Sequence, residues 1–256
     1  MAYDPRNAAG LGTDQLDDQA SMPLLNLIQQ NSPQVNKQEE KYIEGASAGD
    51  IFFAPTGRIL EQPIEFTPTA FRTVYVEWIP RAKGGGIVGI HPLTVVDDPA
   101  YEQGRERKFD EWLGANQLKK TTYVLGLIKV NNEITQAMLA LSVTGQKVSR
   151  KLQGDIRKFR YDGDLADVPP AVFARSFKIT SIYEKNKDDE GYYNWKLEEP
   201  RVLDFEADED LLTAAEESAT QSKLMLPSPQ EQPRPALAAP EIGSDVIVND
   251  TENTPY

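Results

Sequence analysis

The spacing of apolar residues changes once along this chain, and that change limits the folds it can adopt. Residues 71–80 are rich in β-branched and aromatic side chains and end at a proline, which predicts a strand. Residues 121–130 and 134–142 repeat this composition on either side of an Asn-Asn pair, a tight-turn signal. From Thr144 onward the two-residue repeat gives way to helical spacing.

The predicted helix has one apolar side and one basic side. Val148, Leu152, Ile156 and Phe159 recur at spacings of four, four and three residues, which is typical of a helix packed along one stripe. At about 100° per residue, the basic residues of the same segment fall on the opposite side. Thr144 is placed to cap the start of this helix.

Several weaker elements complete the pattern. Residues 50–61 predict two short strands around a turn, and residues 172–183 and 192–198 alternate as strands do. An apolar patch within residues 23–44 predicts a short helix. The charged segment 97–118 is predicted to include another helix.

Antiparallel hairpins dominate this order, and no alternation of strand, helix and parallel strand is found. The predicted fold is mainly β, an antiparallel barrel of the oligonucleotide/oligosaccharide-binding (OB) type with one amphipathic helix. A sandwich with an added helix is the alternative. We expect a disordered N-terminal tail at 1–22, a folded domain at 23–203 and an acidic disordered tail at 204–256, with a possible short helix at 208–218.

The charge is distributed unevenly along the chain. The net charge is −13, yet residues 119–160 hold nine basic and two acidic residues, while residues 204–256 hold two basic and twelve acidic ones. Fields within about a Debye length, roughly 8–10 Å, decide a local contact. A basic surface on this acidic protein is therefore able to attract a polyanion.

Cations and aromatic rings together suggest a surface for single-stranded DNA, where phosphates meet basic groups and bases stack on exposed rings. A solvated helix face is the alternative for the basic residues, and core packing is the alternative for each ring. The candidate phosphate-binding residues are Arg81, Lys83, Lys119, Lys120, Lys147, Arg150, Lys151, Arg157, Lys158 and Arg160. The candidate base-stacking residues are Tyr75, Trp78 and Tyr123.

Signals for catalysis are weak. The chain has no cysteine and a single histidine, and it lacks a phosphate-binding loop and a nucleophile elbow. We therefore expect no enzyme activity, metal or cofactor. A divalent-metal nuclease built on Asp97, Asp98 and Glu102 is the catalytic alternative. No apolar run approaches membrane-spanning length and no signal peptide is found, so we expect the cytoplasm, that of a host cell if a phage encodes the protein.

The end of the chain carries a short motif. Asp250 and Glu252 precede Pro255 and the terminal Tyr256. This tip resembles the acidic C-terminal tail of bacterial and bacteriophage single-stranded-DNA-binding proteins, which ends in an aromatic residue. The resemblance implies that the four residues bind replication or recombination proteins, and that the acidic stretch competes with DNA for the basic cleft.

The core is similar to a group of bacteriophage proteins at residues 42–46, 76–81 and 191–195. Taken together, these features predict a protein that binds and protects single-stranded DNA during phage replication, recombination or repair. The alternative is a non-enzymatic accessory or virion protein that binds other proteins through its tails. The sequence leaves the oligomeric state open.

Overall fold

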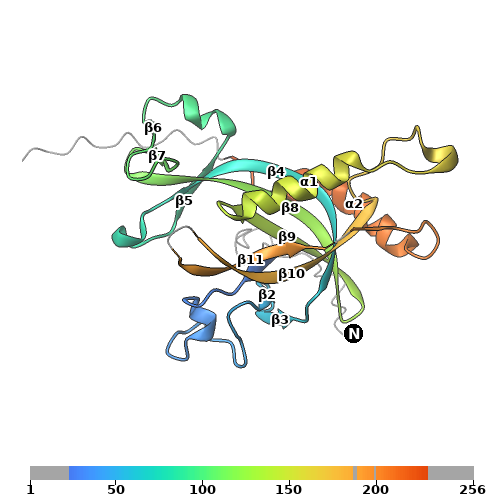
Figure 1. Ribbon diagram of the computed structural model, residues 1–256, viewed down its shortest axis with the longest axis horizontal. Helices are drawn as coiled ribbons and strands as arrows, with labels where there is room; N and C mark the ends of the chain where they lie inside the picture. Colours follow the sequence, from blue (N-terminus) through green and yellow to red (C-terminus); the bar gives the residue numbers. More distant parts are fainter. Residues whose placement is uncertain (1–22, 187–188, 199, 230–256) are drawn as a thin grey trace, which may run out of the picture.

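The computed structural model describes residues 23–186, 189–198 and 200–229. Most of these residues belong to one strongly curled sheet with two helices against it (Figure 1). The strands are β1 (Leu24–Leu27), β2 (Ile51–Phe53), β3 (Arg58–Leu60), β4 (Ile64–Trp78), β5 (Ile87–His91), β6 (Tyr101–Gln103), β7 (Glu111–Leu113), β8 (Asn116–Val130), β9 (Glu133–Ser142), β10 (Arg175–Lys185), β11 (Gly191–Leu197) and β12 (Arg201–Val202). The helices are α1 (Gly145–Lys158) and α2 (Glu209–Met225), and short 3-10 turns include η3 (Pro33–Val35), η4 (Arg81–Lys83), η5 (Leu93–Asp97) and η6 (Gly163–Leu165).

The sheet follows the order β11-β10-β4-β8-β9-β1-β2-β3. Its pairings are antiparallel except that of β1 with β9, which is parallel. Strands β11 and β3 end this path without pairing to each other within the described residues. The result is an open half-barrel, so the mainly β prediction is confirmed, whereas the closed barrel expected from the sequence is not formed.

The curl has a local cause in the two longest strands. A bulge between Pro68 and Ala70 interrupts the register of β4 with β8, and proline is tolerated inside a strand at such a bulge. Gly126 lies directly opposite Pro68. The ring of Phe66 occupies the space that a side chain at Gly126 would need. A bulge facing a glycine bends the sheet at this point.

The two helices cover opposite faces of β8. Ile128 belongs to the core cluster that includes Val148 and Leu152 of α1. The adjacent Leu127 packs with Leu211 of α2, and neighbouring strand residues point to opposite faces. We call the α1 side the inner face and the α2 side the outer face; Figure 1 shows α1 in yellow crossing the curled sheet and α2 in orange.

Side chains form hydrogen bonds to the edge of β11 that no strand of the described residues pairs with. Gln29 Nε2 donates to the carbonyl of Tyr193 at 2.9 Å, and Gln29 Oε1 accepts the N–H of Tyr193 at 2.8 Å. Further along the same edge, Lys151 Nζ donates to the carbonyl of Leu197 at 2.8 Å. These contacts satisfy backbone groups that an exposed edge strand would offer to another chain.

Replacing Gln29 by alanine should lower the free energy of unfolding by about 1–3 kcal/mol, because its two hydrogen bonds to the edge of β11 are lost. Denaturant unfolding followed by circular dichroism measures the change. Gln30→Ala is the matched control, since Gln30 is exposed on the neighbouring turn. Equal stability of Gln29→Ala and the wild type would show that this edge needs no such hydrogen bonds.

The sequence-based elements agree with the structure in the centre of the chain and differ at two places. Strands were predicted at the positions of β4, β8, β9, β10 and β11, and the helix at α1. The helix predicted within 23–44 is wrong, because Leu24–Leu27 forms β1 between β2 and β9. The helix predicted within 97–118 is also wrong, because this segment contains the paired strands β6 and β7.

The predicted domain boundary after residue 203 falls inside the packed unit. Helix α2 buries Leu211 and Ala215 against Leu127, and Leu226 packs with Val76 on the outer face. The helix expected at 208–218 is present and longer than predicted. The predicted tail at 1–22 lies outside the described residues.

Candidate nucleic-acid interface

One exposed face of α1 carries five cations. We call it the basic face; it consists of Lys147, Arg150, Lys151, Arg157 and Lys158, all exposed. The opposite side of α1 is fixed to the core by Val148 and Leu152, with Ile156 packed beside them. At about 100° per residue the five cations span an arc of about 120°, and 14 residues give the helix a length of about 21 Å.

The basic face has few opposite charges near it. Lys147 Nζ lies 3.9 Å from Glu184 Oε1. Hydrogen bonds from Asn194 and Tyr192, together with the charge of Lys147, hold the pKa of the Glu184 carboxyl below its usual range. Within the described residues, the other four cations form no ion pair with a carboxylate. Like charges three and four residues apart destabilise a helix, so a bound polyanion would relieve repulsion here.

Two more predicted cations lie near the ends of the basic face. Gln146 Nε2, in the first turn of α1, donates to the carbonyl of Lys120 at 3.1 Å, so Lys120 lies beside the start of the helix. Arg160 donates from Nη1 to the carbonyls of Arg157 at 2.8 Å and Phe159 at 2.6 Å. It therefore satisfies carbonyls at the C-terminal end of α1.

The remaining predicted cations lie elsewhere. Lys119 is on the outer face, with Nζ 5.6 Å from the centroid of the Trp78 ring. Lys83 is exposed in η4, between β4 and β5, and the side chain of Arg81 lies outside the described residues. Lys119 and Lys120 adjoin in a strand and so point to opposite faces. Within the described residues, Lys119 and Lys83 therefore do not share one groove with the basic face of α1.

Two of the three predicted stacking rings are buried. Tyr75 is 6 % and Tyr123 is 7 % exposed, so neither presents a face to a base as predicted. Tyr75 donates to Glu111 Oε1 at 2.7 Å, and burial followed by this carboxylate raises its pKa. Burial also raises the pKa of Tyr123. Both rings are buried because both faces of the sheet are covered here: Tyr75 packs with Val95 and Leu118, and Tyr123 packs with Leu226, which follows α2. Trp78 is half-buried.

The carboxylates of 97–111 do not converge. Glu102 pairs with Arg105, and Asp98 accepts the N–H of Ala100. Glu111 accepts hydrogen bonds from two tyrosines. Within the described residues, no group of three or more acidic or histidine side chains is placed to hold a metal ion. The single histidine of the chain is His91, whose Nε2 lies 2.6 Å from Oε2 of the buried Glu77.

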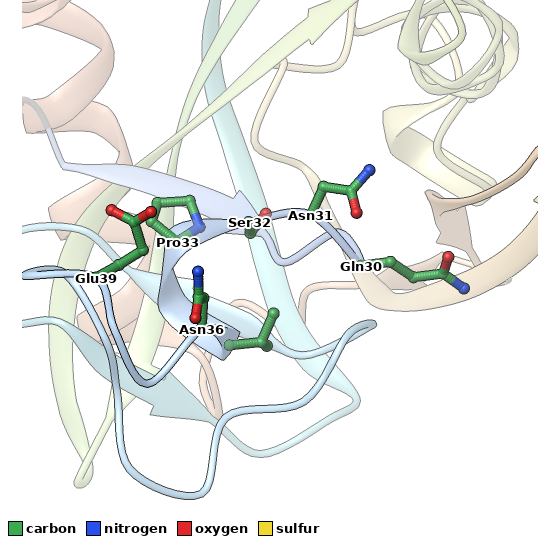
Figure 2. A pocket seen from close by; sticks show the side chains of 7 residues that line it. Gln30, Asn31, Ser32, Pro33, Asn36 and Glu39 are labelled. Carbon is green, nitrogen blue, oxygen red and sulfur yellow. The ribbon is translucent and has the colours of Figure 1, made fainter.

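An open hollow of about 520 Å³ lies at the turn between β1 and β2 (Figure 2). Figure 2 shows Gln30 and Asn31 at one side of it and Glu39 at the other. Its lining contains a carboxylate and no cation, which does not suit a phosphate chain. The hollow therefore differs in charge from the basic face, and we do not include it in the candidate interface.

The sequence model of a bacteriophage family, described as Pam3 phage gp34-like protein, matches residues 2–223. The chain belongs to this family. No curated protein and no solved structure matches the chain. The gp34-like match spans the sheet, α1 and most of α2. Asp250, Glu252, Pro255 and Tyr256, the predicted partner-binding tip, lie beyond the match and outside the described residues.

Membership of the gp34-like family identifies the chain as a bacteriophage protein. A bacteriophage origin was expected from the sequence and is confirmed. No helix in the described part of the chain is long and apolar enough to cross a membrane.

The sequence-based reasoning missed a row of aromatic rings at the C-terminal end of α1, formed by Phe159, Tyr161 and Phe205. The first two alternate with cations in the segment Arg157 to Tyr161, which was a usable signal. Phe205 is more than forty residues away in sequence, and only the fold brings it to the other two.

Proposed function

We propose that this gp34-like protein binds single-stranded DNA through the basic face of α1, without changing it chemically. The observation that carries the proposal is the presence of five cations on one exposed helix face, of which only Lys147 forms an ion pair with a carboxylate of the described residues. Phosphate contacts of this kind carry no base information. Binding is therefore independent of sequence, as protection of DNA during phage replication, recombination or repair requires.

Aromatic rings favour a single strand over a duplex as the ligand. Phe159 immediately follows α1 and contacts Tyr161, with the ring centroids 5.1 Å apart. Unpaired bases stack on such rings, whereas the bases of a duplex are already stacked on one another. The acidic tail is proposed to compete with DNA for the basic face, and its tip to bind replication or recombination proteins.

Titration of fluorescent oligo-dT with the full chain tests the proposal. Five phosphate contacts give a log–log salt slope of about −3.5, since each contact on a single strand contributes about 0.7. Affinity should therefore fall about 100-fold between about 50 and about 200 mM salt. A duplex of equal length should compete less well than oligo-dT. Absence of binding at the lower salt concentration would refute the proposal.

A second candidate function rests on exposed apolar residues around β5. Ile87 and Val88 are exposed on this strand, and Leu93 and Val96 are exposed in η5. Within the described residues β5 pairs only with β4, so its other edge is free. Such a surface favours contact with another protein, as in a phage accessory or virion protein. That function predicts no oligo-dT binding and a stable protein complex recovered from infected cells.

A further inference from the structure

Three aromatic rings form a row that begins at the C-terminal end of α1. The centroids of Phe159 and Tyr161 are 5.1 Å apart in an edge-to-face arrangement, and those of Tyr161 and Phe205 are 5.9 Å apart. The guanidinium carbon of Arg175 lies 4.9 Å from the centroid of the Phe159 ring. The row is therefore backed by a cation at its inner end and open at Phe205.

Phe205 is exposed, and the turn that carries it is held by several hydrogen bonds. Its side chain is 57 % exposed. On either side of it, Asp204 accepts the N–H groups of Glu206 at 2.9 Å and Ala207 at 2.8 Å. These backbone donors lower the pKa of Asp204. The N–H of Asp204 donates to Asp208 Oδ2 at 2.8 Å.

An ion pair attaches this turn to the sheet. Arg201 pairs with Asp208 at 2.6 Å and with Glu65 of β4 at 2.6 Å. The hydrogen bond from Arg201 lowers the pKa of the Asp208 carboxyl. Asp204 accepts hydrogen bonds within the turn, and the charge of Asp208 is paired with Arg201. The turn therefore holds Phe205 as an exposed ring next to Tyr161.

The ring row follows the last cations of α1 along the chain. Phe159 is the first residue beyond α1, directly after Arg157 and Lys158 in the chain. Within the described residues, Arg175 and Arg160 form no ion pair with a carboxylate. A strand that runs along α1 toward its C-terminal end therefore approaches the ring row after the last two cations of the helix.

We propose that Phe205, supported by Tyr161 and Phe159, is the platform on which an unpaired base of single-stranded DNA stacks. The phosphates on either side of that base lie toward α1. This inference rests on the proposed function and adds the base-contacting site, which lies far along the chain from the tyrosines named from the sequence.

The test compares two chains of equal length, oligo-dT and an abasic deoxyribose-phosphate oligomer, with wild type and Phe205→Ala. Stacking on one ring contributes about 1–3 kcal/mol per base, so Phe205→Ala should bind oligo-dT about tenfold more weakly. It should bind the abasic chain as the wild type does, and its salt slope should not change. Phe109→Ala, which removes another exposed phenylalanine, is the matched control and should bind both chains normally.

A second variant reports the contact directly. Phe205→Trp should keep the affinity for oligo-dT, and its added emission should be quenched by oligo-dT but not by the abasic chain. Unchanged oligo-dT affinity of Phe205→Ala would overturn the inference while leaving the proposed function intact. An equal loss of affinity of Phe205→Ala for oligo-dT and for the abasic chain would also overturn the inference, because it indicates that the substitution disturbs the turn. If the wild type binds neither chain, the proposed function itself fails.

Discussion

Replacing Arg150, Arg157 and Lys158 together by glutamine should weaken oligo-dT binding about 100-fold at about 0.1 M salt. Each single-strand phosphate contact contributes about 0.7 to the steepness of the plot of log affinity against log salt, so three lost contacts make this slope shallower by about two. At about 0.1 M salt, a change of about two in the slope corresponds to about a 100-fold loss of affinity. Glutamine is a good helix former, and these three side chains are exposed on α1. The fold should therefore be unaffected. Fluorescence anisotropy at several salt concentrations measures both quantities.

The choice of these three residues avoids structural contacts. Lys147 lies near Glu184, and Lys151 bonds to a backbone carbonyl at the edge of β11, so both are left in place. The matched control replaces Lys37, Lys41 and Arg58 by glutamine; these cations are exposed on the turn after β1 and on β3. The control removes the same charge and should lose little affinity. Equal losses in the two triple variants would show that net charge, rather than the basic face, determines binding.

The sequence was sufficient to place α1 and its two sides. Its apolar stripe and its cations lie within one continuous segment, so local spacing alone determines which side of the helix faces the core. Leu152 and Val148 pack inward as predicted. The same holds for β8 and β9, which are joined by a two-residue turn whose Asn131 and Asn132 both have positive φ.

The elements that the sequence did not predict correctly are formed by pairing between segments that are distant in the chain. Leu24–Leu27 is apolar and short, a pattern that fits a helix turn as well as a strand; its partners in β2 and β9 make it a strand. Trp112 belongs to β7 because β8 pairs with that segment. The ring row is a stronger case, since Phe205 joins Phe159 and Tyr161 only through the packing of α2 and β12 on the sheet.

The boundary between the folded domain and the acidic tail was also predicted too early, because contacts distant in the chain hold residues 204–229 on the sheet. An acidic, alanine-rich segment suggests disorder by composition, yet the apolar side chains of α2 are buried, Leu211 and Ala215 among them. Three further contacts tie this segment to β4. Thr69 and Ser218 share a buried hydrogen bond of 3.0 Å. Arg72 donates to the carbonyls of Leu226 at 2.7 Å and Pro227 at 3.2 Å.

Truncation after residue 203 should therefore destroy the fold, whereas truncation after residue 229 should preserve it. The shorter chain loses Leu211 and Leu226 from the outer face, and each buried leucine contributes about 2–5 kcal/mol. It also leaves Leu127 and Val76 uncovered. These losses are comparable to the whole stability of a domain, about 5–15 kcal/mol. We expect the 1–203 chain to aggregate or unfold, and the 1–229 chain to melt at the same temperature as the full protein.

The 1–229 chain is consequently the correct reagent for testing competition by the tail. Residues 230–256 contain five acidic residues and one basic residue. If this charge competes with DNA for the basic face, the 1–229 chain should bind oligo-dT several-fold more tightly at low salt, and the difference should shrink as salt screens the tail. The full chain with its five tail carboxylates converted to amides (Glu231, Glu241, Asp245, Asp250 and Glu252) should reproduce the gain. Identical affinities of all three proteins would reject competition and leave the tail free for protein partners alone.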